Sequence, residues 1–300
     1  MKNKKVLVTG GAGFVGSHLC EKLLKLNNIV YSLDNYFTGS VDNHINGVKY
    51  IKGDTKDIFK LIDFVPDIVF HLGEYSRVEQ SFEDMSLVYE YNKIGTFKVL
   101  EFVRKIGAKL IYAGSSTKFG DGGIARNTSP YAWTKASNTE LVINYGNWYN
   151  INYAITYFYN VYGPREISTG RYATLIALFK EKMKKNEPLT IVRPGIQKRN
   201  FTYIDDIING LILVAKDGYG DEFGIGNDEA FTILEVAEFF LGMNMECAAK
   251  QGKVIMLPER SGNRMSAEVI TDKTKFLGWE PKTFLKECVK DLKQNNWVFK

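Results

Sequence analysis

Three glycines near the N-terminus constrain the fold more than any other feature of this sequence. Gly11, Gly13 and Gly16 lie in "VLVTGGAGFVGSHL", after an apolar run at 5–9 and before a helical pattern at 14–26. Glycine lets the backbone turn tightly and approach a pyrophosphate, whose negative charge is favoured at a helix N-terminus. The glycine pattern alone is weak evidence, but its position between strand and helix predicts a dinucleotide-binding loop.

Short β-branched runs alternate with longer amphipathic stretches through the first half of the chain. The predicted strands lie at 5–9, 29–33, 48–51, 67–72, 109–114 and 153–159. The predicted helices lie at 14–26, 56–64, 81–106 and 130–149. This alternation predicts an α/β fold of the Rossmann type, with a doubly wound parallel sheet.

The alternation becomes less regular in the second half. Helical patterns at 172–186, 205–216, 231–241 and 282–294 are separated by short strands. We expect a dinucleotide-binding Rossmann domain over 1–162 and a smaller C-terminal α/β substrate lobe over 163–300. No long linker separates the two parts, so we expect a ligand to bind in the cleft between them.

Asp34 ends the second predicted strand, 34 − 16 = 18 residues after the last glycine of the loop. A carboxylate at this spacing binds the hydroxyls of the adenosine ribose. It repels a 2′-phosphate, and no arginine follows closely, so the sequence predicts NAD rather than NADP as the cofactor. The P-loop pattern GxxxxGK[ST] does not occur in the sequence, which argues against a P-loop NTPase.

The overall composition is that of an ordinary globular protein. Hydrophobic residues make up 45% of the 300 positions, charged residues make up 24%, and the net charge is +5. These values argue against disorder and against nucleic-acid binding. Glycines interrupt the short apolar run at the N-terminus, and no run approaches the length that spans a bilayer. We therefore expect a cytoplasmic protein without a nucleic-acid or membrane partner.

Cysteine and histidine are few and far apart. Their spacing matches neither a disulfide framework nor a metal site, so we expect a reducing compartment and no bound metal. These residues are Cys20, Cys247, Cys288, His18, His44 and His71.

A tyrosine and a lysine four residues apart lie in "SPYAWTKA" (129–136). Ser129 is suited to cap a helix that begins at Pro130, so Tyr131 and Lys135 lie on one face of its first turns. A nearby ammonium, a helix N-terminus and an oxidised nicotinamide all favour the phenolate of a tyrosine, which can then act as a base. Alone, the pair would more often be an exposed tyrosine and lysine.

Together with the glycine loop, these residues resemble the extended short-chain dehydrogenase/reductase superfamily, in its branch of NAD-dependent nucleotide-sugar epimerases and dehydratases. The resemblance covers nearly the whole chain. It includes "LDN" (33–35), "GDTKD" (53–57), "HLGEYSRVEQS" (71–81), "YNKIGT" (91–96), "YAGSS" (112–116), "YAWTK" (131–135), "NVYGPR" (160–165), "RNFTYIDD" (199–206) and "PERSGN" (258–263).

The resemblance implies a role for each matching position. Tyr131 is the expected base, Ser115 its partner at the sugar hydroxyl, and Lys135 the residue that holds the nicotinamide ribose. The expected NAD-binding residues are Gly10, Gly11, Gly13, Phe14, Val15, Gly16, Asp34, Asn35, Asp54, Thr55, Leu72, Asn92, Tyr131 and Lys135. The expected substrate-binding residues are Arg77, Ser116, Asn160, Arg199 and Arg260.

Departures from the family pattern narrow the reaction. The 4,6-dehydratases need an acid beside the serine, where this chain has Ser116 and Thr117. Hydroxyl groups do not readily act as general acids at neutral pH. The 3,5-epimerases use a cysteine near this loop, and none lies close in sequence. Oxidation at C4 remains, followed either by hydride return, as in a 4-epimerase, or by release of the ketone, as in a 4-dehydrogenase.

Two further departures concern the sugar pocket. The segment between Gly120 and Ser129 is shorter than is usual in the family, which would leave the pocket wall more open. Glu74 stands where small residues are common, either as a functional carboxylate near the nicotinamide or as a solvated loop residue.

Within this branch the chain is particularly similar to bacterial enzymes that oxidise C4 of GDP-heptose for capsular polysaccharide.

Three alternatives remain open at the level of the sequence. The main prediction is C4 oxidation of GDP-heptose to a 4-keto sugar, and the close alternative is a UDP-hexose 4-epimerase. A nucleotide-sensing regulator is a third possibility, although such proteins on this fold typically lose the catalytic tyrosine or lysine. The family also implies a homodimer or higher homo-oligomer formed through 81–106 and 130–149, with apolar positions that could equally cover the sheet. These positions are Leu87, Ile94, Val99, Leu141 and Tyr145.

Overall fold

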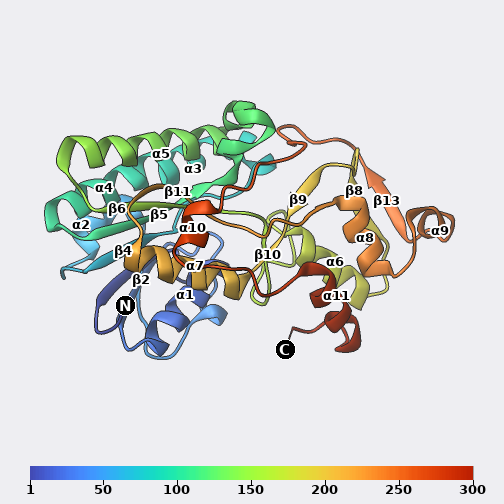
Figure 1. Ribbon diagram of the computed structural model, residues 1–300, viewed down its shortest axis with the longest axis horizontal. Coiled ribbons are helices and arrows are strands. Elements are labelled where there is room, and N and C mark those ends of the chain that lie inside the picture. The colour runs from blue at the N-terminus through green and yellow to red at the C-terminus, as the bar shows by residue number, and fades with distance from the viewer. Residues whose placement is uncertain (300) are drawn as a thin grey trace.

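A seven-stranded parallel sheet forms the centre of residues 1–299, the part of the chain that the computed structural model describes (Figure 1). The strand order is β11-β6-β5-β4-β1-β2-β3. The strands are β1 (Lys5–Thr9), β2 (Ile29–Asp34), β3 (Lys49–Lys52), β4 (Ile68–His71), β5 (Lys109–Ser115), β6 (Tyr153–Phe158) and β11 (Gly220–Ile225). The order and the parallel pairings confirm the predicted Rossmann-type α/β fold.

Helices cover both faces of this sheet, and each face has its own apolar core (Figure 1). Leu19 of α1 (Phe14–Lys25) and Leu211 of α7 (Ile204–Asp217) are fully buried in one core. Val99 of α4 (Gly95–Ile106) and Val142 of α5 (Pro130–Tyr149) are fully buried in the other, to which α2 (Ile58–Leu61) also contributes. Strands covered on both faces are mainly apolar, which explains the run of three apolar residues at the centre of β1.

The helix predicted over 81–106 is divided in the structure. A 3-10 turn (Glu79–Phe82) and α3 (Met85–Val88) lead into a π-helical turn (Tyr89–Ile94), and α4 follows directly. π-helical turns are rare and frequently lie at functional sites. Here the turn contains Asn92, which is fully buried.

The C-terminal part contributes a second group of short elements with a separate core. Three two-stranded sheets pair β8 (Leu189–Val192) with β13 (Val254–Leu257), β9 (Lys198–Asn200) with β12 (Ala230–Thr232), and β7 (Val161–Tyr162) with β10 (Thr202–Tyr203). Phe179, Phe240 and Val289 form the centre of its core. Its helices are α6 (Leu175–Lys184), α8 (Ile233–Leu241), α9 (Met245–Lys250) and α11 (Leu285–Gln294).

The chain crosses between the two parts more than once. After the C-terminal lobe has begun, α7 packs against α1 and β11 adds the edge strand beside β6. The short α10 (Asp272–Phe276) then packs against β11. The division into domains at residue 162 remains a proposal, and these elements pack with the sheet although they follow that position.

None of the helices formed by residues 1–299 is both long enough and apolar enough to cross a membrane.

Candidate active site

A cavity of about 830 Å³ lies at the carboxyl ends of the central strands. In open α/β sheets this edge is where ligands bind, because the glycine loop and the neighbouring strand ends converge there. The C-terminal lobe supplies the opposite wall, through residues such as Leu175 and Thr190. The cavity therefore lies between the two parts of the chain, as the sequence predicts.

Nearly all the predicted site residues line this one cavity. The lining includes Gly10, Gly13, Phe14, Val15, Gly16, Asp34, Asn35, Asp54, Thr55, Leu72, Arg77, Ser115, Ser116, Tyr131, Lys135, Asn160, Arg199 and Arg260. Gly11 and Asn92 are not among the lining residues. Both residues contact other parts of the protein instead.

The glycine loop packs so closely that side chains would not fit. A Cβ on Gly16 would lie 2.0 Å from the carbonyl oxygen of Gly10, which itself has a φ of +75°. A Cβ on Gly11 would lie 2.4 Å from Ser32 Oγ in β2, so Gly11 serves the packing of loop on sheet. Among the described residues, none caps α1 with its side chain, and Gly13 is the N-cap. The N–H groups of this helix end are thus left for a phosphate, which fits the pyrophosphate of NAD.

Acidic and amide side chains follow β2 and β3 at the same edge. Asp34 Oδ2 accepts from the Ala12 backbone N–H at 2.9 Å, and Asp34 Oδ1 accepts from the Tyr36 N–H at 2.8 Å. Burial raises the pKa of Asp34 despite these two bonds. Asn35 Nδ2 donates to Asp54 Oδ2 at 3.1 Å. This set of oxygen acceptors suits the hydroxyls and amino group of an adenosine.

Asn92 supports the site from behind. Its Oδ1 accepts from the Tyr75 N–H at 2.7 Å, and its Nδ2 donates to the Tyr75 carbonyl at 3.2 Å and to Thr134 Oγ1 at 3.0 Å. The side chain therefore ties the segment after β4 to α5. The resemblance implies that Asn92 binds NAD, but Asn92 is fully buried and does not line the cavity, so in this structure it supports the active-site region instead.

The first turn of α5 places the predicted base. Ser129 Oγ accepts from the Ala132 N–H at 3.1 Å and Pro130 is the first helical residue, as the sequence predicts. The Tyr131 hydroxyl donates to Ser115 Oγ, at the end of β5, at 3.1 Å. Thr117 Oγ1 also donates to Ser115 Oγ, at 2.9 Å. The hydroxyls of Tyr131 and Ser115 thus lie where one sugar hydroxyl could form hydrogen bonds with both.

Lys135 lies one turn further along α5 and is almost fully buried. Its Nζ donates to a carboxylate oxygen of Glu74 and to the carbonyl of Ala113. The Glu74 side chain is 2% exposed and that of Lys135 is 6% exposed. Glu74 is therefore a buried partner of the predicted catalytic lysine, and the alternative of a solvated loop residue is wrong.

His71 belongs to the same buried network. Its Nδ1 lies 2.8 Å from Thr9 Oγ1 and its Nε2 lies 2.9 Å from Thr96 Oγ1, which in turn donates to Glu74 Oε1 at 2.7 Å. Burial lowers the pKa of His71 to about 4, so the ring is neutral at physiological pH. Within residues 1–299, no cluster of three histidine, cysteine or acidic side chains could hold a metal ion.

Three predicted substrate arginines line the cavity in different settings. Arg77 Nε donates to the Tyr172 carbonyl at 2.9 Å, and burial lowers its pKa. Arg199 Nη2 donates to Asn263 Oδ1 at 3.0 Å, and burial lowers the pKa of Arg199 to about 10. Arg260 is more exposed and forms an ion pair with Glu79 at 2.9 Å.

Arg264 is a lining residue that the sequence analysis missed, although it directly follows the "PERSGN" segment. Its Nη2 donates to Ser116 Oγ at 3.2 Å. Its Nη1 is buried and has no hydrogen-bond partner among the described residues. A guanidinium nitrogen in this state is a donor available to a ligand.

The short segment after Gly120 explains how Arg264 reaches the cavity. Asp121 Oδ1 accepts from the N–H groups of Met265 at 3.1 Å and Ser266 at 3.0 Å, and Gly120 bridges to Ala267. A Cβ on Gly120 would lie 3.1 Å from Arg264 Cδ. The short segment after Gly120 therefore holds the C-terminal segment that carries Arg264 against the wall of the cavity. The sequence had predicted a more open pocket at this wall.

Comparison with known proteins places this geometry in a family. Residues 6–226 match the profile of the "NAD dependent epimerase/dehydratase family". This chain belongs to that family. The cofactor is NAD, and the glycine loop, Asp34 and the uncapped end of α1 are the features that fit it.

Several relatives share the whole architecture. UDP-glucuronic acid decarboxylase 6 of Arabidopsis thaliana is 30% identical over 95% of this chain and 86% of its own length. The UDP-glucose 4-epimerase of Thermus thermophilus, solved with NAD, is 30% identical, with a TM-score of 0.82 over 95% of this chain and 96% of that one. The UDP-glucose 4-epimerase of Thermotoga maritima, solved with UDP-glucose, is 28% identical, with a TM-score of 0.85 over 97% and 99%.

These similarities confirm the family and the cofactor that the sequence predicts. The protein is an enzyme of the NAD-dependent nucleotide-sugar epimerase/dehydratase type. The names of the relatives above concern UDP-sugars, and none concerns GDP-heptose.

Proposed function

We propose that this enzyme is a nucleotide-sugar 4-epimerase acting on UDP-hexoses. The observation that carries the proposal is the hydrogen bond of 3.1 Å between Tyr131 and Ser115 beside the dinucleotide loop. This pair is built to bind one secondary hydroxyl and remove its proton. The two solved epimerases described above share the fold over nearly the whole chain.

In the proposed reaction each side chain has a separate task. Ser115 binds the C4 hydroxyl of the sugar, and Tyr131 takes its proton during oxidation and returns it afterwards. Lys135 holds the nicotinamide ribose. NAD supplies reversible hydride acceptance when it is bound.

The residues beside Ser115 argue against elimination of water. Ser116 and Thr117 follow it, and the charged neighbour is the guanidinium of Arg264, 3.2 Å from Ser116 Oγ. A guanidinium is not a general acid at neutral pH, because it holds its proton too tightly. The 4,6-dehydratase alternative is therefore disfavoured by the chemistry of the side chains.

The arginines that line the cavity support a diphosphate substrate. Arg77, Arg199 and Arg260 line the cavity that also contains the Tyr131–Ser115 pair. Planar guanidinium groups can meet two phosphate oxygens at once. We propose that these arginines and Asn160 bind the nucleotide portion, while Ser116 and Arg264 lie beside the sugar.

C4 oxidation of GDP-heptose, with release of a keto sugar, remains a prediction from the sequence. The two UDP-glucose 4-epimerases described above favour the 4-epimerase reaction instead. The regulatory alternative is less well supported, because Tyr131, Lys135 and Ser115 are all present and Tyr131 and Ser115 are already hydrogen-bonded.

The test mixes near-stoichiometric enzyme and NAD with UDP-glucose, UDP-glucuronate or GDP-heptose in separate reactions. We expect UDP-glucose to yield its C4 epimer by NMR, with only a transient absorbance of reduced nicotinamide. A lasting absorbance with a 4-keto sugar would replace the proposal with a dehydrogenase. A pentose product from UDP-glucuronate would indicate a decarboxylase, and tight NAD binding without turnover would indicate a sensor.

A further inference from the structure

A loop of the C-terminal part reaches back onto the N-terminal part, and the proposed reaction gives it no role. The loop comprises residues 167–174, directly before α6, and none of these eight residues belongs to a helix or a strand. Gly170, Arg171, Ala173 and Thr174 of this loop line the cavity. Compact loops whose two ends lie close together are frequently functional.

The two ends of the loop are tied together at its base. The Thr174 N–H donates to the Ile167 carbonyl at 3.0 Å. Thr174 Oγ1 donates to Glu166 Oε1 at 2.6 Å, and Glu166 Oε2 accepts from the Gly163 N–H at 2.9 Å. Further out, Gly170 has a φ of +74°, and a Cβ there would meet nothing within 4 Å. The base is therefore fixed, whereas the backbone near the tip is not closely packed.

The tip of the loop is held by the segment that follows β4. The Tyr172 hydroxyl donates to Asp84 Oδ2 at 2.9 Å, and Gln80 Nε2 donates to the Arg171 carbonyl at 2.7 Å. Arg171 also pairs with Glu83 at 2.9 Å, but the Glu83 side chain is 79% exposed, and pairs of this kind contribute little. The Asp84 side chain is only 13% exposed, so its bond to Tyr172 is the stronger contact.

Asp84 also binds a tyrosine of the N-terminal part. Its Oδ2 accepts from the hydroxyl of Tyr75, a residue that is 2% exposed, at 2.7 Å. Hydrogen bonds from Tyr75 and Tyr172 hold the pKa of Asp84 below its usual value, so the acceptor is a carboxylate. One oxygen atom therefore receives a hydroxyl from the loop and a hydroxyl from the wall against which the loop lies.

The docked tip also fixes a residue of the proposed substrate site. Arg77 lines the cavity, and its Nε donates to the Tyr172 carbonyl at 2.9 Å. Its Nη1 donates to the Ser76 carbonyl at 2.9 Å. Within residues 1–299, the Nη2 of Arg77 has no hydrogen-bond partner. The loop thus orients the guanidinium and leaves Nη2 available to a phosphate oxygen.

We infer that residues 167–174 form a lid, that the Tyr172–Asp84 hydrogen bond holds the lid shut, and that the lid opens to let the nucleotide sugar enter and leave. The inference rests on the proposed function, since it takes Arg77 as a ligand of the substrate diphosphate. Opening breaks the bonds at the tip and keeps those at the base. Lids of this kind exclude water from the reaction, and their opening often limits ligand exchange.

The first experiment measures opening of the lid in the NAD-loaded enzyme, without substrate or turnover. Trypsin cleaves after Arg171, and mass spectrometry of the fragments gives the rate of this cleavage, which follows the population of the open form. Tyr172→Phe should speed cleavage about tenfold or more, because it removes a hydrogen bond to a charged group. Tyr75→Phe is the matched control: it removes the other hydroxyl from the same oxygen but leaves the lid bonded, so the rate should change less than about twofold.

A second variant keeps the test valid if Tyr172→Phe does not fold. Asp84→Leu removes the acceptor and leaves the cleavage sequence at Arg171 unchanged. It should speed cleavage at least as much as Tyr172→Phe. Saturating UDP should slow cleavage of the wild type, because the nucleotide binds beneath the closed lid. Cleavage at the wild-type rate in Asp84→Leu, or equal acceleration in Tyr172→Phe and Tyr75→Phe, would overturn the inference.

The second experiment measures UDP binding to the immobilised enzyme by surface plasmon resonance. In Tyr172→Phe the rate constants of association and dissociation should rise together, about tenfold, while Kd stays within about threefold. This parallel change is specific to a lid. A residue that only supports the binding site would raise Kd through faster dissociation alone, and that result would contradict the inference.

The two experiments separate the lid from the proposed function. Binding of GDP in place of UDP would refute the UDP-hexose proposal, and the same comparison of rate constants would then be made with GDP. If neither nucleotide binds, the cleavage rates alone decide for or against the lid. An active UDP-hexose 4-epimerase whose cleavage and binding rates do not change in Tyr172→Phe would refute only the lid.

Discussion

The Tyr131 hydroxyl and Ser115 Oγ lie 3.1 Å apart, although the two residues come from different elements 16 positions apart in the chain. β5 ends at Ser115 and α5 begins at Pro130, so the end of the strand and the first turn of the helix meet. Both side chains are therefore held by backbone that is part of regular structure. Sites on helices and strands keep their geometry better than sites on loops.

Tyr131→Phe should abolish turnover but not cofactor binding. The phenyl ring keeps the packing and removes the only group of this residue that carries the proton. Loss of a general base typically costs about 10²–10⁴-fold, so kcat should fall by at least that range. Steady-state kinetics measures the loss, and fluorescence titration should show NAD affinity within a few-fold of the wild type. Retention of more than about a tenth of the activity would contradict the assignment of the base.

Asp34→Asn should weaken the discrimination against NADP. The amide keeps nearly the same shape and one acceptor for the Ala12 or Tyr36 N–H, but it lacks the charge that repels a 2′-phosphate. We expect the ratio of NADP to NAD affinity to rise about tenfold or more, which corresponds to about 1.4 kcal/mol. Calorimetric titration of both cofactors measures it. An unchanged ratio would show that Asp34 does not select the cofactor.

Arg264→Met should impair use of the substrate without affecting the fold. The variant removes the buried Nη1 donor and the bond to Ser116, while methionine retains the apolar stem. A hydrogen bond from a charged donor contributes about 1.5–3 kcal/mol, so kcat/KM should fall about 10–100-fold. The same change at Arg126, in a more exposed ion pair with Glu140, should alter kcat/KM less than about twofold. Equal losses of kcat/KM at both positions would show that Arg264 does not act at the sugar site.

Six strands of the sheet and the start of the helix that carries Tyr131 could be predicted from the sequence, because both depend on local patterns. The apolar strands, the glycine loop and the Ser129–Pro130 start of α5 each have a signature within a few residues. Even α5 has the predicted bounds, 130–149. These elements required no knowledge of the tertiary structure.

The parts that were missed depend on tertiary contacts. β11 (Gly220–Ile225) contains "GDEFGI", whose polar start gives no strand pattern, and it is stabilised by pairing with β6. Arg264 reaches the cavity only because Asp121 holds the segment that carries it. The partner of Lys135 lies 61 residues earlier in the chain, so no spacing rule could link Glu74 to it.

Glu166→Gln should make the stability of the protein less sensitive to rising pH. Burial raises the pKa of Glu166 to about 7, although it accepts bonds from the Gly163 N–H and Thr174 Oγ1. Because the folded protein holds this proton more tightly than the unfolded chain, stability is lost as pH rises from about 4.5 toward 7. Glutamine removes this loss, so the variant should gain about 1–3 kcal/mol at pH 8 relative to its difference at pH 4. Urea unfolding of the wild type and the variant at pH 4 and at pH 8 measures both differences in the free energy of unfolding.

The control for Glu166 is Glu246→Gln. Glu246 is exposed on α9 and pairs with Lys250 at 2.6 Å, and it should give the same small difference at both pH values. A pH-independent effect of Glu166→Gln would show that its carboxyl ionises normally in the folded protein.

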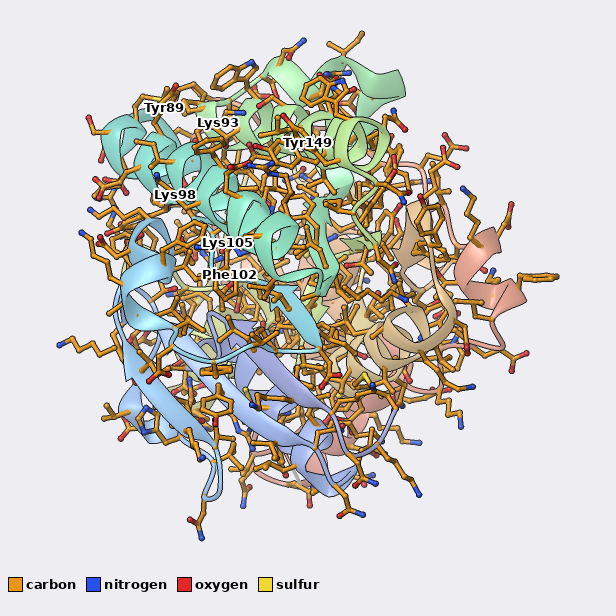
Figure 2. The ribbon with its side chains drawn as sticks, turned by 90° about the vertical axis from the view of Figure 1, so that its left-hand side faces the viewer. Tyr89, Lys93, Lys98, Phe102, Lys105 and Tyr149 are labelled. Atoms are coloured by element: carbon orange, nitrogen blue, oxygen red, sulfur yellow. The ribbon has the colours of Figure 1, made fainter. Side chains whose placement is uncertain are left out.

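Several exposed apolar side chains on α4, α5 and the adjoining π-helical turn support the proposal of a homodimer. Figure 2 shows Tyr89 of the π-helical turn and Tyr149 of α5 on this side of the molecule, which also carries Lys93, Lys98 and Lys105. Of the positions expected here, Val99 and Tyr145 are buried against the sheet, whereas Ile94 is exposed. The exposed apolar residues of these helices and the adjoining turn are Tyr89, Ile94, Phe97, Trp133, Trp148 and Tyr149.

Phe97→Glu should convert the proposed dimer into a monomer. Phe97 lies on α4 with 42% of its surface exposed, and a charge there would have to be buried in the interface without a partner. Light scattering after size-exclusion chromatography should show a dimeric wild type and a monomeric variant at the same concentration. Phe276→Glu is the control, because Phe276 lies on α10 and is 91% exposed, so it should not change the mass. A monomeric wild type, or a variant that remains dimeric, would show that this face is not the interface.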